Sequence, residues 1–173
     1  QRFSGYEQIN LLQKVRFKPT KNLDFKYGFT YAKTGNAPRY DRLIQYRSGK
    51  LRFAEWYYGP MIWSLHNLEI LASKKKVLFD ESKLTVAYQD YEESRVDRTR
   101  TNNNRNMQKE TVKAISINAD ANKTIGKGKL FYGIEYVYNK VGSTGERTNI
   151  GTGAVSPYVS RYPDGSTWST AGI

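Results

Sequence analysis

Apolar and polar side chains alternate along this sequence with a period of two. From Leu23 to Tyr31 every odd position is apolar or aromatic, and every even position is polar or small. The same alternation recurs within residues 9–17, 84–88, 115–119 and 130–138. Because successive side chains of a strand point to opposite faces, each stretch predicts a strand with one apolar face and one polar face. No apolar pattern of helical period competes with it, so we expect an all-β fold.

Two all-β architectures explain such strands. A soluble sandwich turns its polar face to water, whereas an outer-membrane barrel turns its aromatic face to lipid and its polar face to a wet interior. Tyrosine outnumbers phenylalanine by 14 to 7, which suits a surface where rings meet both apolar and aqueous surroundings. No run approaches the roughly 18 apolar residues of a membrane-spanning helix, which excludes that class of membrane protein.

The spacing of the strands favours the barrel. Six strands are expected, at about residues 8–18, 23–34, 61–73, 77–98, 108–121 and 129–141. Short turns are expected near 19–22, 74–76 and 122–127, and long loops at 35–60, 99–107 and 142–173. In an up-and-down antiparallel meander this order puts every short turn at one end and every long loop at the other. Outer-membrane barrels have this asymmetry.

Charge and cysteine content limit the partners. The net charge is +12, and much of the basic excess lies in the expected loops, which would attract anions. There is no cysteine, which excludes disulfides and thiol chemistry. The sequence opens on Gln1 without a signal peptide and stops at Ile173 without a terminating pattern. We therefore expect an internal piece of a larger protein.

Four stretches resemble a known family. They are Tyr58-Gly-Pro-Met-Ile-Trp63, the stretch from Ala87 to Arg98, the stretch from Glu135 to Gly145, and the stretch from Arg161 to Trp168. Together they resemble the TonB-dependent outer-membrane receptors of the Bacteroidetes type, especially the haem- and haemoglobin-receptor-like branch. The resemblance implies a barrel of about 22 strands around an N-terminal plug.

The resemblance also implies a function and a set of partners. Such receptors import scarce nutrients, usually iron chelates or haem, with energy relayed from the inner membrane. This sequence has no plug domain and no TonB box, so it is expected to be a central barrel segment in the outer membrane. The implied partners are outer-membrane lipid, a small nutrient ligand, and a TonB-type energy-coupling protein reached through the missing plug. No enzymatic activity and no cofactor are expected.

Ligand-binding residues are not specified by any motif. The candidates are the aromatic and basic side chains of the long loop 35–60: Tyr40, Arg42, Tyr46, Arg47, Arg52 and Trp56. His66, the only histidine, could bind haem iron. It lies in the middle of a strand and no second axial ligand is evident, so we interpret it as a structural residue and expect no metal site.

Two further functions were considered: catalysis or metal binding by a cluster of acidic residues, and nucleic-acid binding by the basic residues. Asp90 and Glu92 share a strand face, close enough for acid/base or metal chemistry, and Glu93 follows. Basic residues follow at once, however, which favours a ladder of alternating charges over catalysis. Nucleic acid would need basic and aromatic side chains on one surface, and here they lie on different ones. We therefore expect no nucleic-acid partner for the barrel segment.

If the chain is not part of a barrel, the alternative function is a soluble basic β-domain that binds an anionic polymer, either polysaccharide or nucleic acid.

The segment alone is expected to self-associate. Six strands of a larger barrel leave unpaired backbone groups on the first and last strands, and such edges recruit other chains. The apolar face also loses its lipid when the segment is placed in water.

Overall fold

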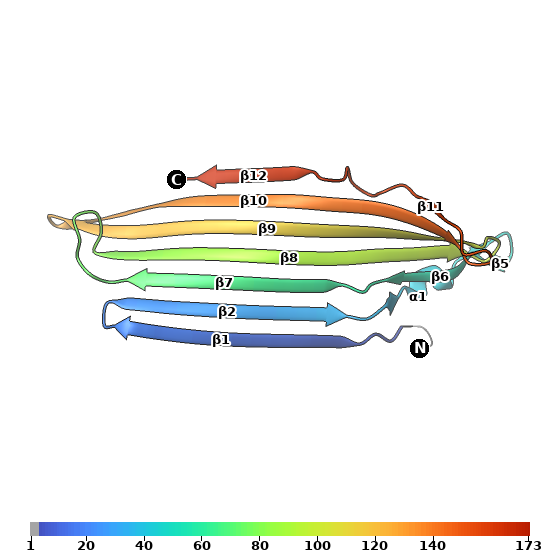
Figure 1. Cartoon of the computed structure of the whole chain (residues 1–173), viewed down its shortest axis with the longest axis horizontal. Coiled ribbons are helices and arrows are strands. Elements are labelled where there is room, and N and C mark those ends of the chain that lie inside the picture. Colours follow the sequence, from blue (N-terminus) through green and yellow to red (C-terminus); the bar gives the residue numbers. More distant parts are fainter. Residues whose placement is uncertain (1–3) are drawn as a thin grey trace.

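Ten strands join into one antiparallel sheet in the computed structural model, which describes residues 4–173 (Figure 1). The long strands are β1 (Gln8–Thr20), β2 (Leu23–Thr34), β7 (Ile62–Ala72), β8 (Glu81–Thr99), β9 (Asn104–Ile125) and β10 (Gly128–Asn149). Each pairs with the next in this order. The outer edge of β10 pairs with β11 (Val155–Pro157) and β12 (Thr167–Gly172). The predicted all-β antiparallel meander is confirmed.

The register places side chains on the two faces as the alternation predicts. Phe25 lies opposite Ile70 of β7, and the same row continues through β8 and β9 to Ile134 of β10. Lys26 lies opposite Glu69 on the other face. We call the first face the aromatic face; it carries Leu23, Phe25, Tyr27, Phe29, Tyr31, Leu68, Ile70, Leu84, Val86, Ile117, Leu130, Tyr132, Ile134 and Tyr136. The other is the polar face, with Asp24, Lys26, Thr30, Glu69, Lys83, Asn118, Asp120 and Glu135.

Much of the aromatic face is exposed. Ile134 is 60% exposed and Phe17 is 63% exposed. Among residues 4–173 the buried apolar side chains are Phe53, Trp56 and Val96, which all lie at one end of the sheet. A contiguous exposed apolar surface of this kind marks an interaction surface.

The connections alternate between the two ends of the sheet as predicted. The expected division into short turns and long loops holds only in part, because the connection at 73–80 is longer than the one at 100–103. The short-turn end holds the connections at residues 21–22, 73–80 and 126–127, and the long-loop end holds those at 35–61, 100–103 and 150–166 (Figure 1). At the long-loop end, residues 35–60 fold into β3 (Ala37–Pro38), α1 (Tyr40–Leu43), β4 (Tyr46–Arg47), β5 (Lys50–Leu51) and β6 (Phe53–Tyr58). β6 pairs with β8 beyond the end of β7. The short helix α1 was not expected.

Several predicted boundaries were wrong. The turn expected at 74–76 is a longer loop, residues 73–80, and the turn expected at 122–127 shrinks to residues 126–127. The loop expected at 99–107 shrinks to 100–103, because its polar residues pair across strands, as Asn106 does with Arg147. The loop expected at 142–173 contains the end of β10 together with β11 and β12. The sheet therefore exceeds the six expected strands.

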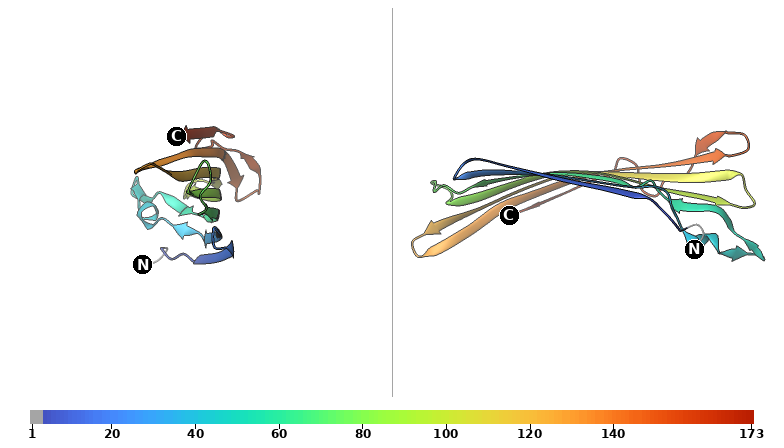
Figure 2. Two further views of the ribbon diagram at one scale, coloured as in Figure 1. Left: turned by 90° about the vertical axis from the view of Figure 1, so that its left-hand side faces the viewer. Right: turned by 90° about the horizontal axis from the view of Figure 1, so that it is seen from below.

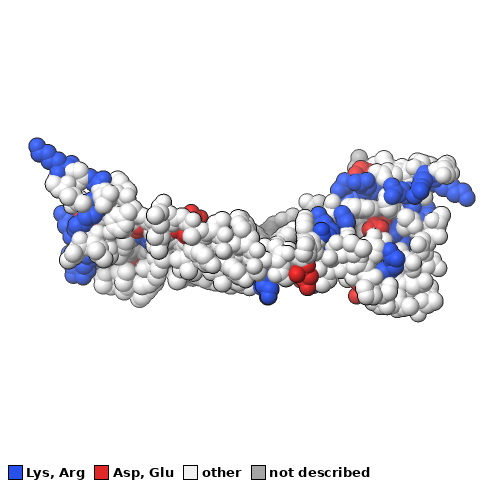
Figure 3. Space-filling view, turned by 90° about the horizontal axis from the view of Figure 1, so that it is seen from above, with Lys and Arg blue, Asp and Glu red and all other residues white. Residues whose placement is uncertain are grey.

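The sheet is long, twisted and open (Figure 2). One free edge is β1, which is exposed at every residue. The opposite edge is formed by β11, β12 and the start of β10. Seen edge-on from the side of β10 and β12, Lys and Arg side chains gather at the two ends, and the stretch between them shows few charges (Figure 3). No helix within residues 4–173 is long and apolar enough to cross a membrane.

Candidate functional site

All six candidate loop residues lie in the folded segment at the long-loop end. The amide of Arg39 donates to the carbonyl of Trp56 at 3.0 Å, which ties the start of α1 to β6. Between β4 and β5 the chain turns through Ser48 and Gly49, whose φ angles are 50° and 75°. Two positive φ values in succession are typical of a tight two-residue hairpin turn. The segment is thus a small ordered unit attached to β8.

A hollow of about 560 Å³ opens between α1, β5 and β6. The candidates Tyr40 and Tyr46 line it, and they are 41% and 70% exposed. Its other lining residues are Leu43, Ile44, Leu51, Phe53, Ala54 and Arg100. Mostly apolar walls with a few hydroxyl groups and one guanidinium suit a small ligand with an apolar body and an acidic group.

Trp56 lies inside this segment, not at its surface. Its side chain is 8% exposed, and its ring meets that of Tyr58 edge to face at 4.9 Å between centroids. The guanidinium carbons of Arg39, Arg42 and Arg95 lie 5.2, 5.8 and 6.0 Å from the Trp56 ring centroid. Cations at this distance from an indole ring are attracted by its electron-rich face. Trp56 and Arg42 therefore organise the segment.

Arg39 completes this cluster, although sequence reasoning did not select it. Its Nε and Nη2 each donate to the carboxylate of Asp41 at 2.7 Å, and Nη1 donates to the Tyr58 hydroxyl at 3.0 Å. The hydrogen bond from Arg39 holds the pKa of Asp41 below its usual value. Asp41 is a near neighbour of Arg39 in the sequence, but Tyr58 reaches Arg39 only when β6 pairs with β3. No local pattern therefore distinguishes Arg39 from the other loop arginines.

The candidates Arg52 and Arg47 do not line the hollow. The Arg52 guanidinium carbon lies 4.7 Å from the ring centroid of Phe53, and its amide donates to Gln45 at 2.8 Å. Arg47 is exposed on the β4–β5 hairpin, directly opposite Lys50. Two cations facing each other repel, so this tip favours an anionic group nearby.

His66 lies on the aromatic face in the middle of β7, away from the loop hollow. Its Nδ1 is 2.8 Å from the hydroxyl of Tyr27, and its ring centroid is 4.8 Å from that of Phe29. Residues 4–173 contain no group of three or more His, Cys, Asp or Glu side chains placed to hold a metal ion. The ring contacts and the tyrosine hydrogen bond account for His66.

Three carboxylates of β8, Asp90, Glu92 and Glu93, were considered as a candidate site. Asp90 and Glu92 share the aromatic-face side, as expected, and Glu93 lies on the other. Lys109 Nζ lies 2.8 Å from Glu92, whereas Asp90 sits opposite Lys113. This arrangement agrees with a charge ladder.

A stretch that the sequence predicts as plain loop packs against the polar face. We call residues 155–166 the cover segment. The amide of Tyr158 donates to the carbonyl of Gly145 at 2.9 Å, and Gln108 Nε2 donates to the carbonyl of Val159 at 2.8 Å. The amide of Ser143 donates to Asp164 at 2.9 Å. These bonds hold the cover segment against β9 and β10.

Arg161 fastens the cover segment to two strands. Its Nη1 lies 3.0 Å from Glu93 and 3.4 Å from Glu110, which are direct neighbours on β8 and β9. The Glu110 side chain is 4% exposed, and its Oε1 has no hydrogen-bond partner among the described residues. Burial raises the pKa of Glu110 above its usual value, although Arg161 opposes this shift.

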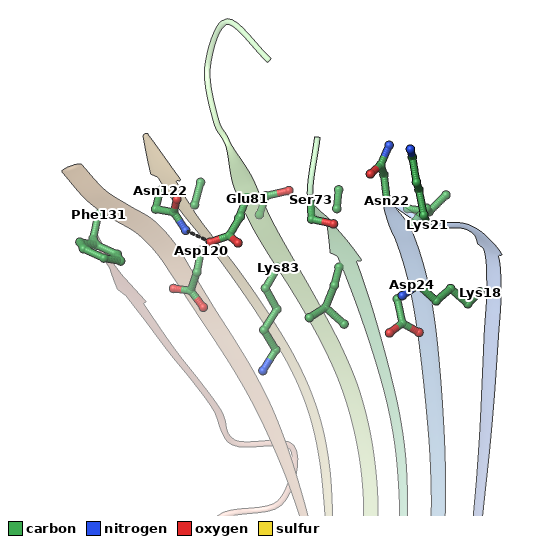
Figure 4. A pocket seen from close by; sticks show the side chains of 15 residues that line it. Lys18, Lys21, Asn22, Asp24, Ser73, Glu81, Lys83, Asp120, Asn122 and Phe131 are labelled. Carbon is green, nitrogen blue, oxygen red and sulfur yellow. Dashed lines mark hydrogen bonds between the residues drawn. The ribbon is translucent and has the colours of Figure 1, made fainter. Parts of the chain in front are cut away.

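A second hollow, of about 420 Å³, lies on the polar face at the short-turn end (Figure 4). Its lining mixes the cations Lys18, Lys21 and Lys83 with the acids Asp24, Glu81 and Asp120. Asn122 Nδ2 donates to Glu81 at 2.8 Å across it. Alternating charges of this kind suit a hydrated surface and select no single ligand charge.

No protein-family model matches the sequence, and no curated protein matches it.

Proposed function

We propose that this chain forms part of the wall of a β-barrel in the bacterial outer membrane, within a TonB-dependent receptor that imports a scarce nutrient such as an iron chelate or haem. The observation that carries the proposal is the exposed aromatic face. In the edge-on view of Figure 3, Lys and Arg gather at the two ends of the sheet. A lipid bilayer would cover that face and leave both ends in water.

Strand lengths support the proposal. A tilted strand crosses a bilayer with about 9–11 residues. β1, β2 and β7 have 13, 12 and 11 residues, which leaves little beyond the membrane. β8, β9 and β10 have 19, 22 and 22 residues. Their surplus extends at the long-loop end, where outer-membrane barrels project their external loops.

The polar face would line the interior. Arg16 pairs with Asp24 there at 2.5 Å, and Lys26 and Lys83 lie 4.0 and 3.9 Å from Glu69. Neither free edge could remain unpaired in lipid, since unsatisfied backbone groups in hydrocarbon cost several kcal/mol each. The remaining strands of a barrel would pair with β1 and β12. A segment isolated in water would instead self-associate.

The nutrient would enter at the long-loop end. There the hollow beside Tyr40 and Tyr46 offers a mostly apolar recess of about 560 Å³, with Arg100 at its wall. The choice of iron chelate or haem rests on the family resemblance alone. The coupling to a TonB-type protein would run through a plug domain outside the described residues.

Single cysteines test the proposed membrane placement, because the sequence has no native cysteine. Thr152→Cys lies at the long-loop end, Ile134→Cys on the aromatic face, and Lys127→Cys at the short-turn end. In intact cells, a maleimide too large to cross the outer membrane should label Thr152→Cys alone. It should label Lys127→Cys only after the outer membrane is opened.

Ile134→Cys provides the decisive comparison. A nitroxide carried on lipid chains should quench a dye at this position, and a water-soluble quencher should not. Recovery of the full-length protein in a detergent-free soluble extract, with equal labelling at all three positions, would instead support the soluble basic β-domain that binds an anionic polymer.

A further inference from the structure

The connection between β7 and β8 is more elaborate than a turn. We call residues 73–80 the lysine loop. It contains three consecutive lysines, Lys74–Lys76, followed at once by Val77 and Leu78. These two apolar side chains are 92% and 74% exposed. Exposing them in water has a cost that a turn of small polar residues would avoid.

The lysine loop is held on the aromatic-face side of the sheet. The hydroxyl of Tyr132, an aromatic-face residue, donates to the carbonyl of Leu78 at 2.5 Å. Lys123 Nζ, on the same side of β9, lies 2.6 Å from the carbonyl of Lys76 and 2.9 Å from Asp80. The loop thus passes beside the ends of β9 and β10 (Figure 1).

Asp80 fixes the base of the loop. Its Oδ2 accepts the amide of Thr124 at 2.9 Å, and the amide of Lys76 donates to the carbonyl of Phe79 at 2.6 Å, which closes a tight turn. The backbone hydrogen bond from Thr124 holds the pKa of Asp80 well below its usual range. Because these bonds already order the loop, Val77 and Leu78 are held outward at little further cost in conformational entropy.

The aromatic face is hollowed next to this loop. A recess of about 420 Å³ is bordered by Tyr132 and Ile134 on one side and by Ile70 and Leu84 on the other, over a floor that includes Ala119. The recess continues the apolar surface from the loop toward the centre of the sheet. It is wide enough to receive part of an acyl chain.

We propose that the lysine loop binds the anionic headgroup surface of the membrane leaflet at the short-turn end. Lys74–Lys76 contact lipid phosphates, and Val77 and Leu78 enter the boundary between headgroups and acyl chains. Basic residues near an anionic leaflet each contribute about 1 kcal/mol, or about fivefold in binding. Exposed apolar side chains beside them add insertion to this attraction. This inference rests on the proposed barrel, because the barrel puts the loop at the membrane surface.

The other connections at this end provide an internal contrast. The turns at Lys21–Asn22 and Gly126–Lys127 carry lysine but no apolar residue. We therefore expect them to stay in water while the lysine loop docks. Lys21→Gln is the matched control for charge, and Lys127→Cys is the matched control for position.

The test places a polarity-sensitive dye on Leu78→Cys in the full-length protein. Bilayer discs are made either of equal parts phosphatidylglycerol and phosphatidylcholine or of phosphatidylcholine alone. In the anionic discs the dye should shift to the blue and be quenched by nitroxide lipids. The dye on Lys127→Cys should stay water-like. Replacing Lys74, Lys75 and Lys76 by Gln should lower the docked-to-undocked ratio by about fivefold per lysine, whereas Lys21→Gln should not change it.

Lipid quenching at Ile134→Cys shows whether the barrel proposal or only the lysine-loop proposal has failed. If lipid quenches Ile134→Cys but not Leu78→Cys, the lysine loop does not dock and the barrel stands. If lipid quenches neither, both proposals are wrong. Equal quenching of Leu78→Cys in the two kinds of disc, unchanged by the Lys→Gln substitutions, would show insertion without headgroup binding and overturn the assignment to anionic lipid.

Discussion

Gly145 accepts the amide hydrogen of Tyr158, and its missing side chain is what lets the cover segment approach this closely. A Cβ at position 145 would overlap the carbonyl oxygen of Tyr158 and lie 2.7 Å from that of Val159. Gly145→Ala should therefore push the cover segment off β10 at a cost of about 1–3 kcal/mol. Hydrogen exchange at the amides of Tyr158 and Tyr162 should accelerate. Gly28→Ala is the control, since a Cβ there meets nothing within 4 Å and should leave exchange unchanged.

Arg161→Ala should release the same segment by a different route. Removing the guanidinium leaves Glu93 and Glu110 facing each other across β8 and β9 without the two ion pairs that Arg161 makes to them. We expect a loss of about 2 kcal/mol of local stability, measured by hydrogen exchange in the cover segment. Arg161→Lys should recover only part of it, because lysine keeps the charge but not the planar fork. Full protection in Arg161→Ala would contradict this role.

The raised pKa of Glu110 predicts how the stability of this region depends on pH. Its pKa is raised in the folded state, so the folded chain holds this proton more tightly than the unfolded chain does. The resulting stability is complete below the unfolded pKa of about 4.3 and is lost as pH rises through the folded pKa. Glu110→Gln cannot ionise and should lack this dependence.

The measurement is the free energy of unfolding of both proteins across that pH window. Glu93, Arg95 and Arg161 also face Glu110, and they remain in both proteins, so the difference between the curves isolates Glu110. Parallel curves would show that Glu110 does not titrate there.

Substitutions at Tyr46 and Trp56 should distinguish a residue that contacts the ligand from one that keeps residues 35–60 folded. Tyr46 is 70% exposed at the hollow, so Tyr46→Ala should weaken nutrient binding and leave the fold of residues 35–60 intact. Trp56→Ala removes a buried ring and should cost about 3–5 kcal/mol, disordering the segment. Equilibrium binding of the nutrient and limited proteolysis distinguish the two results. Equal proteolysis of both variants would contradict the assignment.

His66→Phe should leave nutrient uptake unchanged. The substitution keeps a ring beside Phe29 and removes one hydrogen bond to Tyr27, at a cost of about 1 kcal/mol. Uptake assays in cells that depend on the receptor measure the outcome. A loss of uptake at normal protein abundance would return His66 to the list of ligand-binding candidates.

The faces of the strands could be predicted from sequence, but the ends of the strands could not. Phe25 and Lys26 fall on opposite faces because the backbone itself alternates, whatever surrounds it. Toward the long-loop end the apolar–polar alternation stops, although β8, β9 and β10 continue as strands. Asn104 pairs with Asn149 without any apolar signal, so polar composition was mistaken for loop. β12 depends on a distant pairing, Trp168 with Asn139, that no local pattern encodes.

The candidate site was foreseen only as a region. Aromatic and basic residues in 35–60 indicated this loop as a candidate, and Tyr40 and Tyr46 line a hollow in it. Trp56 is buried under Arg39 and Arg95 because β6 pairs with both β3 and β8. The second pairing joins residues about forty positions apart. Arg161 and Glu110 were missed for the same reason, since their contact spans fifty-one positions.

The order of pairing in the meander has a consequence for how this chain assembles. Each long strand from β7 to β10 pairs with its successor in the sequence, and β9 and β10 are joined by only residues 126–127. The entropy lost in closing so short a loop is small, so this hairpin should form early. Every added strand then leaves one open edge as the template for the next. A chain of this kind can enter its final environment one hairpin at a time.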